Sequence, residues 1–449
     1  MSGDQPPNEQ RWRATLLVTL LGAVLLLLFR IGVRADGAKD LVWFLKIVGL
    51  QTPLYLAAVW LGLRKRESRS VLIIGLIFAA LFRLSILFSP PYLSDDIYRY
   101  IWDGRVQAAG INPYRYIPAD QSLVSLRDEK IYPHINRRDY ARTIYPPAAE
   151  VVYFLTTRVS ESVTWMKATM VGFEVVAVWA VIQLLASFGI PRQRILIYAW
   201  HPLAVWEFSG SGHLDAIAIA FIALALLARR RNSEVGVGLT LACATLTKFF
   251  PIVLAPVLYK RGGWKMPLTF AITVVLAYSP YLGVGLSGAL GFLFGYATER
   301  GIESGEQFFL LSAIRRVSGF QVPSTAFIMV ALLGGAGLVV WCWRRQSRAE
   351  ESYLTNALII GTVFVVLLSP DFAWYFAWLV PFLCFIPVAP VIYLTLASFL
   401  MYVTWFYWQD DQVLRIKALI YLPFVLLLGL TLWLQRQRLD SSPRESGQI

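Results

Sequence analysis

Charged residues are scarce in this chain. Asp, Glu, Lys and Arg make up 15% of its 449 residues, whereas roughly a quarter is usual in soluble globular domains. Hydrophobic residues reach 57% and fall in long blocks, each near the length that crosses a bilayer. This composition excludes a large soluble protein and predicts an all-α, polytopic membrane protein. Because so much of the chain would lie in lipid, we expect one membrane domain over residues 1–449.

Cysteine is also rare. Cys243, Cys342 and Cys384 lie in separate apolar blocks, so the chain carries neither a disulfide framework nor a metal signature. His134 and His201 have no partner at metal-ligand spacing, and we expect no cofactor. No cleavage-site pattern follows the first apolar block, so residues 15–33 are interpreted as a retained helix rather than a signal peptide.

In a soluble protein, the net charge of +13 would suggest nucleic acid as a partner. Here the cations form short clusters between apolar blocks, as the positive-inside rule requires of cytoplasmic loops. These clusters include Arg64-Lys65-Arg66, Arg192 with Arg194, Arg229–Arg231, Lys260-Arg261, Arg344-Arg345 and Arg436 with Arg438. We therefore expect a lipid bilayer and no nucleic acid as partner, with the N-terminus and a tail at 436–449 in the cytoplasm.

Hydropathy predicts about 12–14 transmembrane or re-entrant helices. The segments are 15–33, 42–63, 70–89, 146–160, 165–188, 194–209, 213–228, 235–259, 266–285, 325–343, 354–369, 372–388, 390–408 and 414–434. Segment 146–160 opens on two prolines and is short, so we expect it to enter the membrane without crossing. Segment 235–259 has Lys248 near its middle and two prolines after it, which predicts a broken hairpin that lines a cavity.

This topology places four polar stretches on the outer face: loop 90–146, the turn around Gly212, a second loop at 286–324, and the turn at 369–371. Residues 96–108 of the first loop have apolar residues at helical spacing, which predicts a short amphipathic helix in the interface. Asp95 and Asp96 precede or open this helix, after Ser94. Two interpretations remain open: the acids stabilise the helix start, with Arg99 as partner, or one of them is a general base. The pair could also hold a cation.

Six short motifs occur in order along the chain: SDDIYRY, GINPY, YPP, GHLDA, LTKFFP and SPDFAWY. In this order and spacing they resemble the C-type glycosyltransferase superfamily (GT-C), in particular its bacterial polyprenol-phosphate-mannose-dependent mannosyltransferases, over roughly residues 70 to 390. The resemblance implies a GT-C-like fold in the plasma (inner) membrane. It also implies an inverting transfer of a hexose such as mannose from a polyprenyl-phosphate donor to a glycan, glycolipid or protein, at the extracytoplasmic face.

In that superfamily an acid of the first large external loop is the general base. Carried over, the catalytic residue is Asp96 or Asp95, and Asp96 is preferred because the run from Asp96 to Tyr100 matches the family's Asp-x-Tyr-x-Tyr pattern. The doubled acid departs from that pattern and leaves the choice open. Loop 90–146 is then the catalytic loop.

Eleven further residues are predicted to bind substrate: Arg99, Tyr100, Arg142, Tyr145, Glu207, His213, Asp215, Lys248, Asp371, Trp374 and Tyr375. Arg142 and Lys248 suit a lipid phosphate, although solvated charge, snorkelling or an ion pair are alternatives. His213 and Asp215 follow a glycine-rich turn that also reads as a helix start. The aromatic residues after Asp371 suit stacking on a sugar or an interfacial belt.

A multi-pass transporter or lipid flippase is the alternative function, because broken helices and intramembrane charges suit transport too. The chain has no convincing internal repeat, and its charges concentrate in one external loop. A non-catalytic scaffold or polymerase subunit is a third hypothesis.

Overall fold

In the computed structural model, residues 7–33, 41–64, 66–91, 93–345, 352–405 and 410–441 are described, and every regular element among them is a helix. Among these described residues, seven stretches are long and apolar enough to cross a membrane. They lie in α1 (Pro7–Gly32), α2 (Leu41–Gly62), α3 (Arg69–Leu87), α6 (Val163–Ser187), Lys265–Gly288, α16 (Ser324–Arg345) and α20 (Asp410–Ser441). The predicted all-α, polytopic class is confirmed. Residues 442–449 of the predicted tail lie outside the described residues.

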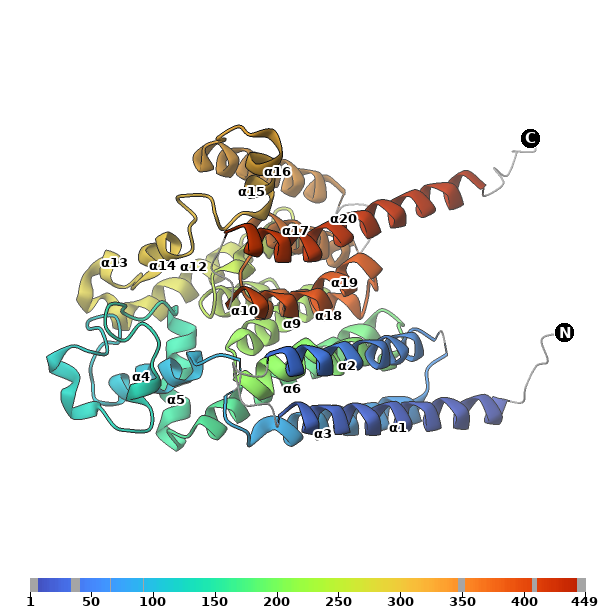
Figure 1. Ribbon diagram of the computed structural model, residues 1–449, viewed down its shortest axis with the longest axis horizontal. Coiled ribbons are helices and arrows are strands. Elements are labelled where there is room, and N and C mark those ends of the chain that lie inside the picture. Colours follow the sequence, from blue (N-terminus) through green and yellow to red (C-terminus); the bar gives the residue numbers. More distant parts are fainter. Residues whose placement is uncertain are drawn as a thin grey trace.

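Shorter helices complete the bundle. They include α9 (Asp215–Arg230), α10 (Glu234–Thr245), α12 (Lys265–Tyr278), η7 (Ser279–Val284), α13 (Gly285–Gly288), α17 (Ser352–Leu368), η8 (Ala373–Leu379), α18 (Val380–Leu383), α19 (Ala389–Ala397) and η9 (Ser398–Trp405). Figure 1 shows α1, α2 and α3 running alongside one another, with the free ends of α1 and α20 at one end of the molecule. The helices α4 (Asp96–Ala108) and α5 (Pro147–Val159) lie at the opposite end.

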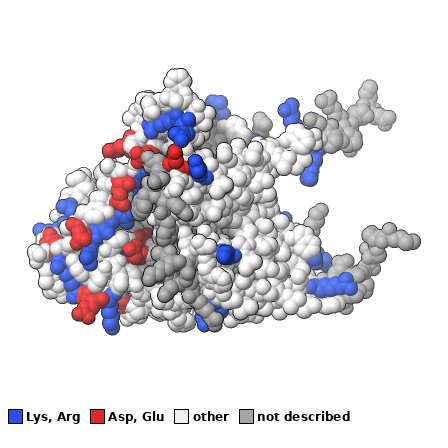
Figure 2. Space-filling model, viewed as in Figure 1, with Lys and Arg blue, Asp and Glu red and all other residues white. Residues whose placement is uncertain are grey.

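Acidic side chains gather at the end that carries α4 and α5. On the face seen in Figure 2, the described charges at the other end are mainly Lys and Arg. This separation agrees with the charge asymmetry expected from the sequence.

Buried polar contacts hold the membrane helices together. Arg83 of α3 donates from Nε to Glu174 of α6 at 2.7 Å, and both side chains are almost completely buried. Trp200 donates its indole N–H to the carbonyl oxygen of Gly75 at 2.7 Å, next to the close approach of Leu196 to that glycine. The Arg83 charge and the Trp200 indole N–H thus find partners inside the bundle, which lipid could not supply.

The stretch predicted as one helix at 194–209 is broken into short pieces. It consists of η4 (Arg192–Ile195), α7 (Leu196–Ala199), α8 (Pro202–Ala204) and a π-helical segment, η5 (Val205–Ser211). Pro202 has no N–H to continue the preceding helix, and Gly212, with φ of 77°, turns the chain into α9. The unbroken helix expected there is therefore wrong, and the turn sets His213 and Asp215 at the start of α9.

The broken hairpin predicted at 235–259 is present. Its first arm is α10, and its second arm is η6 (Phe250–Leu254) followed by α11 (Ala255–Leu258). The Lys260 side chain donates to the side-chain oxygen of Asn232, so the two ends of the hairpin meet. Lys248 lies at the break between the arms, where the helix is interrupted.

Helix α5 does not cross the bundle. At its start, the Ala148 N–H donates to the Leu246 carbonyl oxygen at 2.9 Å, beside the hairpin break. Just beyond its end, Lys167 near the start of α6 donates to the carbonyl oxygen of Ser89, past the end of α3, at 2.8 Å. Both ends of α5 therefore lie toward the α4 end of the molecule, as expected for a segment that enters without crossing. Gly104 allows α4 to pack closely on it, because a Cβ there would lie 2.5 Å from the Tyr153 carbonyl oxygen.

Candidate functional site

A cavity of about 1260 Å³ opens at the α4 end of the molecule. Its wall comes mainly from five parts of the chain: the loop between α3 and α5, the hairpin break, the segment 293–321, the segment 368–375, and the start of α20; Leu214, Thr404 and Trp405 complete it. The first of these contains η2 (Gln121–Leu126) and η3 (Tyr132–His134). The third contains α14 (Leu293–Glu299) and α15 (Phe309–Ser318).

Seven of the residues predicted from the sequence line this cavity: Asp95, Asp96, Tyr145, Lys248, Asp371, Trp374 and Tyr375. They are drawn from segments up to 280 positions apart in the chain, from 95 to 375. The tertiary structure thus brings the first-loop acids, the hairpin lysine and the SPDFAWY aromatics to one space.

The two acids occupy the start of α4. Asp96 is its first residue, and its backbone N–H donates to the Ser94 hydroxyl oxygen at 3.2 Å. Asp95 occupies the N-cap position, but its side chain makes no capping hydrogen bond. Both carboxylates instead accept from one amide, that of Asn136, at 2.9 Å for Asp95 and 2.6 Å for Asp96. Capping by the carboxylates therefore does not account for the pair.

The surroundings of Asp95 change its acidity. Desolvation at the cavity wall raises the pKa of this carboxyl, and the neighbouring Asp96 raises it further, while the Asn136 amide acts in the opposite direction. The balance is a pKa above the ordinary value for aspartate. Asp95 is therefore a weaker acid than an ordinary aspartate.

Lys248 lies on another part of the cavity wall. Its ammonium group lies 2.9 and 3.0 Å from the two carboxylate oxygens of Asp215 and 3.8 Å from the centre of the Tyr375 ring. Of the alternatives left open for this lysine, the structure contains the ion pair. Asp215 is accordingly the partner of Lys248 and is not itself on the cavity wall.

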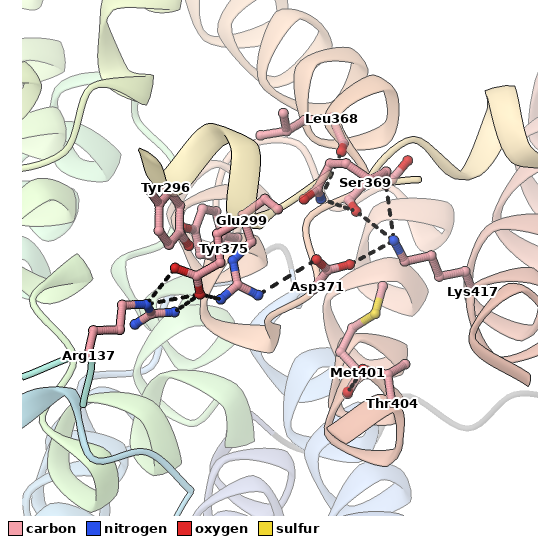
Figure 3. Close-up of polar contacts among 12 residues, drawn as sticks. Arg137, Tyr296, Glu299, Leu368, Ser369, Asp371, Tyr375, Met401, Thr404 and Lys417 are labelled. Carbon is pink, nitrogen blue, oxygen red and sulfur yellow. Dashed lines mark hydrogen bonds and ion pairs between the residues drawn. The ribbon is translucent and has the colours of Figure 1, made fainter. Parts of the chain in front are cut away.

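A series of linked ion pairs runs along the cavity wall from Arg137 to Lys417 (Figure 3). Arg137 is bonded to Glu299 at 2.8 to 3.0 Å, and Glu299 also accepts from Arg300 at 3.0 Å. Arg300 lies 4.0 Å from Asp371, whose other oxygen is 2.7 Å from the Lys417 ammonium group. These ion pairs connect the first loop, the second loop, the 369–371 turn and α20. Hydrogen bonds from both arginines hold the pKa of Glu299 below its usual value, despite the opposing effect of desolvation.

An aromatic wall adjoins the lysines. The Trp374 ring stacks on Phe372 with centroids 4.5 Å apart, and on its other neighbour, His213, with centroids 3.9 Å apart. Glu207 lies 2.8 Å from Nδ1 of His213 and accepts from the Tyr402 hydroxyl at 2.6 Å. His213 and Glu207 are fully buried behind Trp374 and do not line the cavity.

Three other predicted residues lie away from the cavity. Arg99 is buried and donates to Asp103 at 2.8 and 3.0 Å, so the expected pairing with Asp95 or Asp96 is wrong. Tyr100 is buried and stacks on Tyr153, with centroids 4.7 Å apart. Arg142 is exposed and absent from the wall, whereas Arg137, in the same loop, lines it.

The predicted site residues do not include Asn136, Glu299, Arg300 or Lys417, all of which line the cavity. Lys417 lies in an apolar helix and is 3% exposed, so the rule that singled out Lys248 would also have found it. The other three lie in polar loops, where nothing in the local sequence separates them from solvated neighbours.

Comparison with known proteins identifies the family to which the chain belongs. A sequence profile described as "Alpha-(1->6)-mannopyranosyltransferase, N-terminal domain", of the MptA/B family, matches residues 21–260, more than half of the 449 residues. The chain belongs to the MptA/B family. The alpha-(1->6)-mannopyranosyltransferase A of Mycobacterium tuberculosis is 23% identical over 329 residues. That match covers 65% of this chain and 61% of the relative's own length.

The segment that matches the MptA/B profile contributes only one side of the cavity wall. Asp95, Asp96, Asn136, Arg137 and Lys248 lie within residues 21–260, and so does the whole of loop 93–146. The opposite wall, from Leu293 to Lys417, lies beyond the matched segment.

Proposed function

We propose that this protein is a membrane mannosyltransferase that uses a polyprenyl-phosphate mannose donor and works at the extracytoplasmic face. One observation carries the proposal: in a chain of the MptA/B family, a pair of carboxylates and a paired lysine share one cavity at the membrane end that is rich in acids. The acid-rich end is assigned to the outside because cytoplasmic loops carry the excess of Lys and Arg.

In the proposed reaction Asp96 is the general base. It takes the proton from an acceptor hydroxyl as that oxygen attacks the anomeric carbon of the donor sugar. The new carbon–oxygen bond forms on the face opposite the phosphate, so the configuration inverts. The bond to the phosphate oxygen breaks, and the lipid phosphate leaves with the electron pair. This leaving group is already anionic, so no general acid is required.

The cations of the wall suit the donor phosphate. Lys248 and Arg137 both line the cavity, and each is held by a carboxylate in the structure, Asp215 and Glu299 respectively. A bound phosphate would join or replace these carboxylates as partner, which stabilises the charge that develops on the leaving group. Tyr375 and Trp374 provide ring faces for the sugar. Phe309, Leu414 and Trp405 offer an apolar strip for the first part of the lipid chain.

The test is transfer by purified protein supplied with polyprenyl-phosphate mannose and an acceptor glycan. We expect Asp96→Asn to lower the rate by at least about 100-fold, as loss of a general base does. Asp120→Asn is the matched control, because Asp120 lies in the same loop and caps η2, outside the cavity. It should leave the rate unchanged.

Full activity of the Asp96→Asn protein would reject Asp96 as the base. Movement of the lipid across vesicle membranes without formation of a glycosidic product would instead favour the flippase hypothesis.

A further inference from the structure

The side chain of Asn136 lies between the two carboxylates of the cavity. Its amide nitrogen is 2.6 Å from Oδ1 of Asp96 and 2.9 Å from Oδ1 of Asp95. An amide nitrogen carries two hydrogens, and an ionised carboxylate only accepts. One residue therefore supplies one hydrogen bond to each acid. The opposite orientation of the amide would set its oxygen against two carboxylates, so chemistry fixes the assignment.

The backbone around Asn136 is held on both sides. Just before it, the His134 ring of η3 stacks on Tyr98 of α4, with centroids 4.8 Å apart. Just after it, Arg137 has φ of 53°, a left-handed conformation that is uncommon for a residue other than glycine. This turn sends consecutive side chains to different partners: Asn136 to the acids, and Arg137 to Glu299 of the second loop.

We propose that Asn136 is a positioning residue, which holds the carboxylate of Asp96 in place for the acceptor hydroxyl and prevents Asp95 from displacing it. The inference rests on the proposed role of Asp96 as base. Two adjacent carboxylates repel each other, and the two amide hydrogens offset that repulsion. Because Asn136 engages Oδ1 of each acid, Oδ2 of Asp96 is the oxygen presented to a substrate.

The charged and titratable groups that face the pair come from several elements. Arg137 lies in the same loop as Asn136, Tyr98 and Tyr100 are on α4, and Tyr145 precedes α5. Tyr153 lies on α5, and Tyr375 of η8 and Tyr402 of η9 also face Asp96. The tyrosines stay neutral at moderate pH and Arg137 stays charged, so a change at Asn136 acts on the two carboxylates. Removing the amide removes one hydrogen bond to the charged form of each acid, including the bond that holds down the pKa of Asp95.

The experiment compares the pH dependence of kcat/KM in the unmodified protein and in Asn136→Ala. We expect the acidic limb to move to higher pH by about one unit, because the base is protonated more readily. Asn136→Asp keeps the shape but puts a third carboxylate in place of the donor, so its shift should be larger. Asn112→Ala is the control. Asn112 lies in the same loop and donates to the Tyr281 carbonyl oxygen rather than to an acid; its loss should lower thermal stability without moving the limb.

Infrared titration of the carboxyl groups supplies a readout that does not depend on activity. The signal of the pair is assigned by difference against Asp95→Asn and Asp96→Asn, and it should move to higher pH in Asn136→Ala. An unmoved titration and an unmoved acidic limb would overturn the inference. An inactive Asp96→Asn with an unchanged Asn136→Ala would reject the role of Asn136 alone. A fully active Asp96→Asn would reject the proposed base itself.

Discussion

Lys248 and Asp215 form an ion pair whose side chains are 16% and 6% exposed. Removing one partner leaves a buried, uncompensated charge, which costs more than the pair itself contributes. We expect Lys248→Met to destabilise the protein by about 3 kcal/mol, seen as a lower melting temperature in detergent. The double variant Lys248→Met with Asp215→Asn should recover most of that loss while remaining deficient in transfer.

Lys260→Met is the control for this pair, because Lys260 lies at the other end of the same hairpin, bonded to Asn232. It should change the melting temperature little. Equal stability of the single and double variants would mean that the ion pair does not hold the hairpin break.

Asp128 makes the stability of the first loop depend on pH. Partial burial acts to raise the pKa of its carboxyl, but hydrogen bonds from Arg105 and from the backbone N–H groups of Ile131 and Tyr132 outweigh it and lower the pKa to about 2. A pKa lowered on folding stabilises the folded loop above the usual value of 3.8, and this contribution is lost as pH falls toward 2.

Hydrogen exchange, corrected for intrinsic rates, should therefore show residues 121–134 opening as the pH falls from about 4 to about 2. In Asp128→Asn this pH-dependent step should be absent. Asp139→Asn, at an exposed acid of the same loop, should retain it. A step that persists in Asp128→Asn would assign it to another group.

The first and second loops of the cavity wall meet at Gly291. This glycine has φ of 60°, and a Cβ added to it would lie 1.9 Å from the carbonyl oxygen of Thr143. The neighbouring Phe292 N–H donates to that same oxygen at 3.0 Å. Only glycine allows the two backbones to approach so closely. The contact between the second loop and the first therefore requires glycine at position 291.

We expect Gly291→Ala to destabilise the protein by about 2 kcal/mol, because overpacking and a strained φ act together. Transfer should fall as well, since the cavity wall moves. Gly283→Ala is the matched control: a Cβ there meets nothing within 4 Å. Thermal melting and the transfer assay report both effects. A Gly291→Ala protein that behaves like Gly283→Ala would show that the loops do not depend on this contact.

The orientation of the whole molecule can be tested by cysteine labelling. Val124, in the loop between α3 and α5, and Arg66, before α3, are both exposed. The loop that follows α3 and the segment that precedes it lie toward opposite ends of the bundle (Figure 1). In a background where the three native cysteines are replaced by serine, a membrane-impermeant maleimide should label Val124→Cys in intact cells. It should label Arg66→Cys only after the membrane is opened. The reverse pattern would place the cavity in the cytoplasm and reject the proposed donor side.

The helical class and the hairpin follow from local sequence. Long apolar blocks predict membrane helices because lipid supplies no hydrogen bonds to an open backbone. A lysine followed by two prolines interrupts α10, and the structure has the break at Lys248. By contrast, hydropathy predicts one helix at 194–209, whereas the structure has several short pieces there, including a π-helical segment.

By itself the sequence determined that this is an all-α membrane protein of the MptA/B family, with an acidic pair at the start of a short helix in its first loop. Only the tertiary structure decided the partners of that pair. Asn136 donates to both acids from 40 or more positions away, and the neighbouring Arg137 pairs with Glu299, 162 positions further along the chain. Hydropathy and helix periodicity are local properties, whereas which side chains share a cavity depends on how distant segments pack.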